Sequence, residues 1–257
     1  MIRMKDVRWS WLAGFFQAEG CVSLKGELTV SQKDHEPLDL IHDFLKYHFP
    51  KYRALVRRKK FTDYHTLHLY PRVTEQLLPW LRGEKLYRAA EKLVAQNRAL
   101  PKCLPIDDDW TIGFWEGDGS VFLAGPSTGI QVTFSQKDPE VLEELRDHLT
   151  KHSFGSGSLT ETEPKLPTKP GLHSHMNRLT YHCGVRDTRL LAWLHDRVRS
   201  EFRREQLRAF IKAVDLYNTR APKAAKNPST STPEDFLPRK PWRRRKWLQL
   251  QTARNQV

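Results

Sequence analysis

The feature that most constrains the fold of this chain is an internal duplication. Residues 11–21 and 110–120 are both apolar runs rich in small residues, and each ends in an acid followed by glycine. The acids are Glu19 and Asp118, which lie 99 residues apart in a chain of 257. Solenoid repeats are shorter, about 20–50 residues. The spacing therefore predicts a small domain that occurs twice in one chain.

Two further blocks recur in the same order. Leu-Thr-Val-Ser-Gln-Lys-Asp at 28–34 returns as Val-Thr-Phe-Ser-Gln-Lys-Asp at 132–138, and Leu-Leu-Pro-Trp-Leu at 77–81 returns as Leu-Leu-Ala-Trp-Leu at 190–194. Three matched blocks make chance similarity a poor explanation. We expect four segments: a first copy at 1–100, a linker at 101–107, a second copy at 108–218 and a tail rich in Pro, Ser and basic residues at 219–257.

Composition limits the class of partner. The formal net charge is +13 and the pI is about 9.7, which favours a polyanion, with nucleic acid the first candidate. The three cysteines form no CxxC pair, which indicates an intracellular protein without a structural zinc site. Nothing approaches the ~18 apolar residues of a membrane span, and the amino terminus has no long apolar segment of a secretory signal.

The predicted order of helices and strands in each copy is αββαββα. In the first copy, hydrophobic periodicity and turn residues predict a helix, two strands, a helix, two strands, a short helix and a longer helix. Their expected ranges are 8–19, 22–25, 28–32, 36–48, 54–59, 66–69, 77–81 and 84–97.

Alternation along the strands separates an apolar face from a polar one. A face of Lys, Arg, Gln, Thr and Ser suits base edges and phosphates, although an ordinary solvated sheet face shows the same pattern. The predicted DNA-contacting residues are Ser23, Lys25, Glu27, Thr29, Ser31 and His68 in the first copy, and Gln131, Thr133, Ser135, Arg178, Thr180 and His182 in the second.

The two apolar runs predict helices that pack on each other. Small residues at Gly14, Ala18, Gly113 and Gly117 would let two backbones approach closely, which would offset the ~1 kcal/mol that glycine costs in a helix. Each acid then falls at a helix C-terminus, where the helix dipole disfavours negative charge. A divalent cation such as Mg²⁺ between the acids would reverse that cost. The alternative is that both Gly residues are only helix C-caps.

These two runs resemble the nine-residue signature of the LAGLIDADG homing endonucleases, at 12–20 and 111–119. The resemblance implies an α+β fold of two αββαββα copies related by a pseudo-two-fold axis, with the signature helices at the interface and antiparallel sheets forming a saddle for DNA. It implies that Glu19 and Asp118, at the eighth position, bind the metal and are catalytic. The sixth position, often acidic in the family, is Gln17 in the first copy and Glu116 in the second.

The same resemblance assigns further catalytic residues. It implies a polar pocket residue at Gln32 and at Gln136, and a basic residue at Lys85. The second copy has no lysine at the matching place, and Arg197 or Arg199 are the candidates there.

The function implied is a monomeric, intron-encoded, Mg²⁺-dependent endonuclease that makes a double-strand break in a long asymmetric DNA target. Two other hypotheses remain: a maturase that binds intron RNA and assists splicing, and a DNA-binding regulator without catalysis. Acids in both copies argue against the regulator. The expected location is intracellular, in an organelle or a prokaryotic cell.

Overall fold

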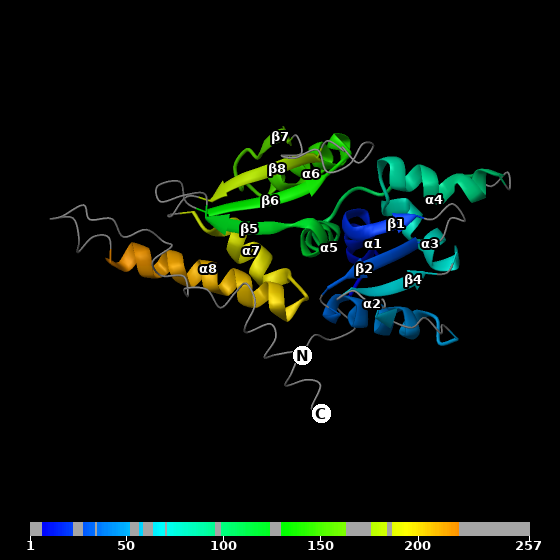
Figure 1. Ribbon diagram of the computed structural model, residues 1–257. Coiled ribbons are helices and arrows are strands. Elements are labelled where there is room, and N and C mark those ends of the chain that lie inside the picture. The colour runs from blue at the N-terminus through cyan, green and yellow to red at the C-terminus, as the bar shows by residue number, and fades with distance from the viewer. Residues whose placement is uncertain are drawn as a thin grey trace, which may run out of the picture.

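The protein is an α+β molecule built from two halves of the same design (Figure 1). The computed structural model describes residues 7–22, 28–33, 35–51, 57–58, 64–69, 71–95, 99–123, 130–162, 176–183 and 187–220. The elements of the first half are α1 (Trp9–Glu19), β1 (Gly20–Val22), β2 (Leu28–Gln32), α2 (Glu36–His48), β3 (Arg57–Arg58), β4 (His65–Leu69), α3 (Pro71–Leu77), the 3₁₀ turn η2 (Leu78–Trp80) and α4 (Gly83–Ala95). Those of the second half are α5 (Asp108–Asp118), β5 (Ser120–Leu123), β6 (Ile130–Gln136), α6 (Pro139–Lys151), β7 (Ser158–Thr162), β8 (Met176–Cys183), α7 (Arg189–Arg197) and α8 (Glu201–Arg220).

The two sheets share one topology. Both are antiparallel and four-stranded, with the orders β1-β2-β4-β3 and β5-β6-β8-β7. One face of each sheet is apolar and buried against helices, as the alternation predicts. Val30 and Leu67 belong to the buried face of the first sheet, and Val132 and Leu179 to that of the second.

Helices α1 and α5 meet backbone to backbone. A β-carbon added to Gly14 would lie 2.0 Å from the carbonyl oxygen of Trp110, and one added to Gly113 would lie 2.0 Å from that of Trp11. The contact is reciprocal, as a two-fold relation between the halves requires. Further along, Gly117 would bring its β-carbon within 2.5 Å of the Ala18 β-carbon. The predicted close packing of these two helices is confirmed.

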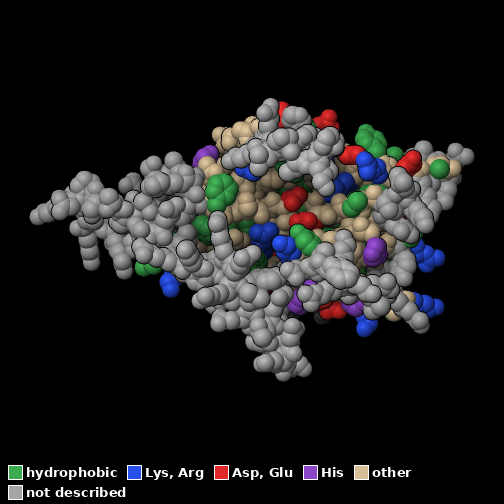
Figure 2. Space-filling view, viewed as in Figure 1, with side chains coloured by type: hydrophobic (Ala, Val, Ile, Leu, Met, Phe, Trp, Pro, Cys, Tyr) green, Lys and Arg blue, Asp and Glu red, His purple; other side chains and the backbone are tan. Residues whose placement is uncertain are grey.

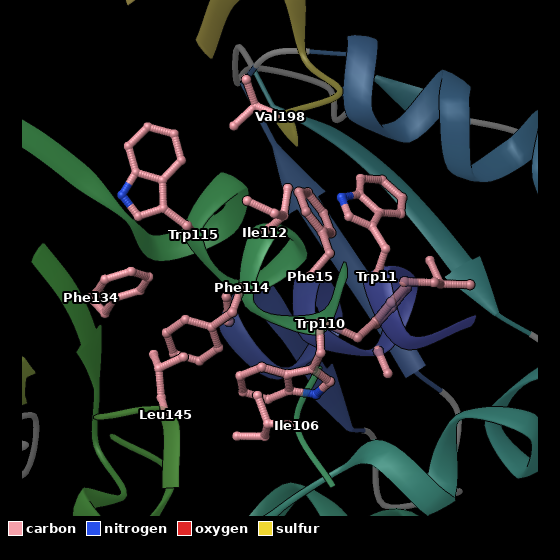
Figure 3. Packing of buried hydrophobic residues seen from close by; sticks show 14 of the residues in the cluster. Trp11, Phe15, Ile106, Trp110, Ile112, Phe114, Trp115, Phe134, Leu145 and Val198 are labelled. Carbon is pink, nitrogen blue, oxygen red and sulfur yellow. The ribbon is translucent and has the colours of Figure 1, made fainter. Parts of the chain in front are cut away.

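Neither of these helices has a solvated face. In α1 every residue from Ser10 to Ala18 is buried, and in α5 every residue from Trp110 to Gly117. A helix that is apolar all round belongs in the centre of a protein. Figure 3 shows Trp110 and Phe114 of α5 side by side in this core, and their rings stack at 5.2 Å between centroids. Asp107 caps α5 by accepting a 2.7 Å hydrogen bond from the Trp110 amide.

Some predicted boundaries were wrong. The short helix expected at 77–81 is present as the 3₁₀ turn η2 (Leu78–Trp80), but a helix that was not predicted, α3, precedes it and begins at Pro71, because proline is favoured in the first turn of a helix. The first half therefore ends in α3, η2 and α4, and the second half ends in α7 and α8. Strand β1 starts at Gly20, directly after α1, and only 57–58 of the predicted strand 54–59 is assigned to β3 among the described residues. The described residues include no helix long and apolar enough to cross a membrane.

Candidate functional site

The candidate site lies where α1 and α5 end together. Glu19 is the last residue of α1 and Asp118 is the last residue of α5, so the packing of these helices brings both carboxylates to one place. A β-carbon on Gly117 would lie 3.1 Å from the Glu19 side chain at Cγ, which shows how near Glu19 comes to the end of the opposite helix. Figure 2 shows acidic side chains near the middle of a hollowed face, with Lys and Arg beside them.

Both acids are harder to ionise than usual. Burial raises the pKa of Glu19 to about 7, and repulsion from the Asp118 carboxylate adds to the effect. Burial likewise raises the pKa of Asp118 to about 6. Desolvation disfavours the charged form of a carboxyl group, and a second carboxylate nearby disfavours it further. The site therefore holds more negative charge than its own surroundings stabilise.

Lys85 sits at the end of α1. Its ammonium group donates to the carbonyl oxygens of Phe16, Gln17 and Ala18, at 3.2, 2.6 and 2.9 Å. The Gln17 and Ala18 carbonyls are among the last of the helix, which lack partners within it, whereas the Phe16 carbonyl also accepts from the Gly20 amide. Burial lowers the pKa of Lys85 to about 8, although the charges of Asp118 and Glu19 act in the opposite direction.

Arg203 does the same for α5. Its guanidinium group donates to the carbonyl oxygens of Glu116 and Gly117, at 3.2 and 3.3 Å. It is the third residue of α8, just as Lys85 is the third residue of α4. Arg203 also lowers the pKa of both Glu19 and Asp118 by its charge.

The two arginines considered for this role lie elsewhere. Arg197 approaches Asp108 at the opposite end of α5, at 3.6 Å, and the Arg199 guanidinium pairs with Asp109. The structure thus corrects the prediction to Arg203. Counting from the start of the last helix in each half, rather than from the preceding Trp, would have found this residue.

The sixth position of each signature run is structural. Gln17 Oε1 accepts from the Arg82 amide at 2.9 Å, just before α4. Glu116 Oε1 accepts from the Arg199 and Ser200 amides, both at 2.6 Å, just before α8, while Oε2 accepts from the Trp11 indole at 2.6 Å. Burial raises the pKa of Glu116. Each side chain anchors the start of the helix that carries the nearby cation, a role that the sequence did not reveal.

The two predicted glutamines occupy different settings. The Gln32 side chain lies close enough to Glu19 to lower the pKa of that carboxyl group. Gln136 is buried, donates from Nε2 to the Gln17 carbonyl at 2.8 Å and accepts from the Lys137 amide at 2.9 Å. Asp118, Lys85 and Gln136 line a common cavity of about 620 Å³. The halves are therefore alike in architecture but not identical in the polar groups that surround the acids.

The predicted DNA-contacting residues divide into three groups. On the polar sheet faces His68 and His182 are exposed, whereas Thr29, Ser31, Gln131, Ser135 and Arg178 are partly exposed. Ser23, Lys25 and Glu27 lie outside the described residues.

Thr133 and Thr180 form the third group, and for them the prediction of DNA contact is wrong. Only 1% of Thr133 and 8% of Thr180 are exposed, so neither presents its hydroxyl freely. They pair across the middle of the second sheet, and Ser120 bonds the Thr133 hydroxyl at 2.6 Å. Alternation along a strand assigns a residue to one face of the sheet but does not predict how far it is exposed there.

Comparisons with known proteins were made on sequence and on structure. No protein-family model matches the chain, and no curated protein sequence does. Among solved structures, the I-SmaMI LAGLIDADG homing endonuclease bound to cleaved DNA is 14% identical over 86% of this chain and 94% of that one, with a TM-score of 0.47. The LAGLIDADG meganuclease I-CpaMI bound to uncleaved DNA is 10% identical over 85% and 95%, with a TM-score of 0.47. Full-length WhiA from Thermatoga maritima is 13% identical over 88% and 70%, with a TM-score of 0.43. Likeness this distant does not identify an activity, so function has to be argued from the site.

Proposed function

We propose that this chain is a site-specific, Mg²⁺-dependent endonuclease that cuts both strands of a DNA duplex. One observation carries the proposal: Glu19 and Asp118 are brought together at the adjoining ends of α1 and α5, with a basic residue over the last carbonyls of each helix. A carboxylate pair at a shared boundary of two like halves suits a reaction that is carried out twice, once on each strand.

The donor set fits a hard cation. Glu19 and Asp118 supply carboxylate oxygens, which are the ligands that Mg²⁺ prefers. Burial raises the pKa values of both acids, and a bound divalent ion would favour their charged forms. When bound, divalent ions would polarise the phosphate and acidify water at the site.

The protein groups around the acids have separate tasks. Lys85 and Arg203 hold positive charge beside the two carboxylates, where they would offset the charge that develops on an attacked phosphate. Gln32 lowers the pKa of Glu19 and would help to keep that carboxylate charged for a cation. Gln136 is held by two main-chain contacts and would present a fixed polar edge toward the cavity beside Asp118.

The polar sheet faces are proposed to carry the duplex. The chain has a net charge of +13, which favours contact with phosphates. Gln131 and His182 are cross-strand neighbours whose side chains form a 3.2 Å hydrogen bond. Arg178 lies on the same strand and the same face as Thr180 and His182. Amide, imidazole and guanidinium groups in such rows can bond base edges in the major groove.

The test is a cleavage selection. The full-length protein is incubated with Mg²⁺ and a library of randomised duplexes, and the cut ends are sequenced. We expect cuts on both strands at one defined sequence, and none with Glu19→Gln or Asp118→Asn. Sequence-specific DNA binding without cutting would instead favour a regulator. Absence of specific DNA binding, with tight binding to structured intron RNA, would favour a maturase.

A further inference from the structure

A second group of metal-binding side chains lies at the far end of α5. Asp108 is the first residue of that helix, about 15 Å along the axis from Asp118. Its Oδ1 atom lies 3.1 Å from His148 Nε2 and 2.8 Å from His152 Nε2. His148 is in the last turn of α6 and His152 caps it. Two histidines four residues apart face the same side of a helix, which is a common arrangement for zinc ligands.

The distances suit a small tetrahedral ion. Zinc bonds of about 2.0–2.1 Å at the tetrahedral angle place ligand atoms about 3.3 Å apart. The two measured separations fall within a few tenths of an ångström of that value, and all three ligand atoms lie within 4.8 Å of one another. An ion could therefore replace the two hydrogen bonds with only a slight opening of the cluster.

The ligand side chains are held in place by their neighbours. The His152 ring stacks on Phe154 at 5.5 Å and lies 5.4 Å from the Trp193 ring. Arg197 lies 3.6 Å from the other carboxylate oxygen of Asp108, and such an outer partner fixes the orientation of a ligating carboxylate.

The duplicated half shows that the fold does not need this cluster. The first residue of α1, which corresponds to Asp108, is Trp9. Its ring packs on Phe44 at 4.9 Å, on His48 at 5.4 Å and on Phe49 at 6.1 Å. One half closes this corner with aromatic packing, whereas the other converges two imidazoles and a carboxylate on one point.

We propose that Asp108, His148 and His152 form a zinc site, separate from the acids at the other end of α5, with a fourth position left for water. Two imidazole ligands favour zinc over Mg²⁺, which prefers oxygen. The bound ion would tie the start of α5 to the end of α6. Arg197 and the positive end of the α5 dipole oppose the ion, so its affinity should be below that of a four-ligand structural site.

The experiment uses tag-free, full-length protein. Co²⁺ is added first, because tetrahedral Co²⁺ absorbs visible light far more strongly than octahedral Co²⁺, and Zn²⁺ is then titrated by calorimetry. Glu19→Gln/Asp118→Asn protein serves as the background, so that the acid pair cannot account for the signal. We expect one tetrahedral equivalent, displaced by Zn²⁺ and not by Mg²⁺. At about 100 times the Kd, Zn²⁺ should raise the Tm by roughly 5–10 °C.

Variants locate the ion. His148→Gln and His152→Gln should each lower the zinc affinity at least tenfold, whereas His48→Ala, which removes a histidine from the matching corner of the first half, should leave it unchanged. An octahedral Co²⁺ spectrum, or no stoichiometric binding by the background protein, would overturn the proposal even if the histidine variants failed to fold. Zinc binding that survives loss of both histidines would overturn it as well.

Discussion

At the scale of single residues, Glu19 and Asp118 have opposite consequences for folding and for the proposed activity. Burial raises the pKa of both, and repulsion from Asp118 raises that of Glu19 further, which costs stability when both are ionised and no cation is present. The same uncompensated charge is what would attract a divalent ion. Activity and stability should therefore respond in opposite directions to neutral replacements.

The first prediction concerns cleavage. Glu19→Gln or Asp118→Asn should abolish double-strand cleavage in Mg²⁺, because each removes one of the two proposed metal ligands, while affinity for the target measured in Ca²⁺ should change little. Gel-based cleavage and binding assays check both. Near-normal cutting by either variant would rule out these acids as metal ligands.

The second prediction concerns pH in the absence of metal. The pKa of Glu19 rises from 4.5 to about 7 on folding, so between these values the folded protein binds more protons than the unfolded chain. Stability should then fall as pH rises through this window, by up to roughly 3 kcal/mol for Glu19. Urea unfolding should show Glu19→Gln to be more stable than wild type near pH 8, with the difference shrinking toward pH 5. Saturating Mg²⁺ should reduce the gap at the higher pH.

The third prediction concerns the two cations. Arg203→Met should impair cleavage as strongly as Lys85→Met, since both remove the positive charge that lies over a helix end beside the acids. Arg197→Met, which lies near Asp108 instead, is the matched control and should cut normally. Single-turnover rates at saturating DNA measure the effect, and normal rates for Arg203→Met would show that the halves are not equivalent.

At the scale of elements, the packing of α1 against α5 positions the two acids and the basic residues beside them. The duplication predicted this pair and the two acids at its ends, because similar sequence in two copies implies similar structure, whereas Lys85 was assigned by the family resemblance. It did not predict Arg203. Lys85 follows Trp80 by five residues, whereas Arg203 follows Trp193 by ten. The extra residues extend α7 to Arg197, which is why counting from Trp193 leads to the wrong arginine.

Tertiary contacts limited the sequence analysis in two other places. The alternation of side chains along the strand correctly assigned Thr133 to the polar face. It carries no information on whether that residue is exposed there. The anchoring roles of Gln17 and Glu116 depend on amides 65 and more than 80 residues away. No local pattern specifies such partners.

The fourth prediction belongs to the helix pair. Gly113→Ala should destabilise the protein by about 3 kcal/mol or more, because its β-carbon would meet the Trp11 carbonyl, a main-chain atom that cannot turn aside. In a helix without this contact the same change would add about 1 kcal/mol of stability. The sign of the change in unfolding free energy therefore shows whether Gly113 makes the close contact. Ala95→Leu, at an exposed position of α4, is a control that should be nearly neutral in thermal unfolding.

At the scale of the whole molecule, the halves are joined by more than the central helices. The Ser200 hydroxyl and the Glu201 amide, at the start of α8, donate to Glu36 of the first half at 3.2 and 2.9 Å. Arg82, just before α4, pairs with Glu144 of the second half at 2.7 Å. The helix that carries each cation is thus fastened across the boundary as well as within its own half.

The fifth prediction concerns the net charge of +13. If the chain follows a long duplex, affinity should fall steeply with salt, by about 10³–10⁵-fold between roughly 50 and 200 mM for six to ten phosphate contacts. Replacing Gln131 should instead relax preference at one or two base positions, by about 1–3 kcal/mol. Titrations on specific and scrambled duplexes at two salt concentrations separate the two effects, and a flat salt response would contradict the DNA proposal.

The reciprocal contact of Gly14 and Gly113 with main-chain carbonyls has a consequence for engineering. A contact between two main chains depends little on which side chains the opposite half carries, so halves from different relatives should be interchangeable in one chimeric chain. The side-chain pairs that cross the boundary, among them Trp11 with Glu116, Arg82 with Glu144 and Glu36 with the start of α8, would have to travel together. Recombination of halves, rather than point mutation of one sheet at a time, is then the shortest route to a new combination of the two polar faces.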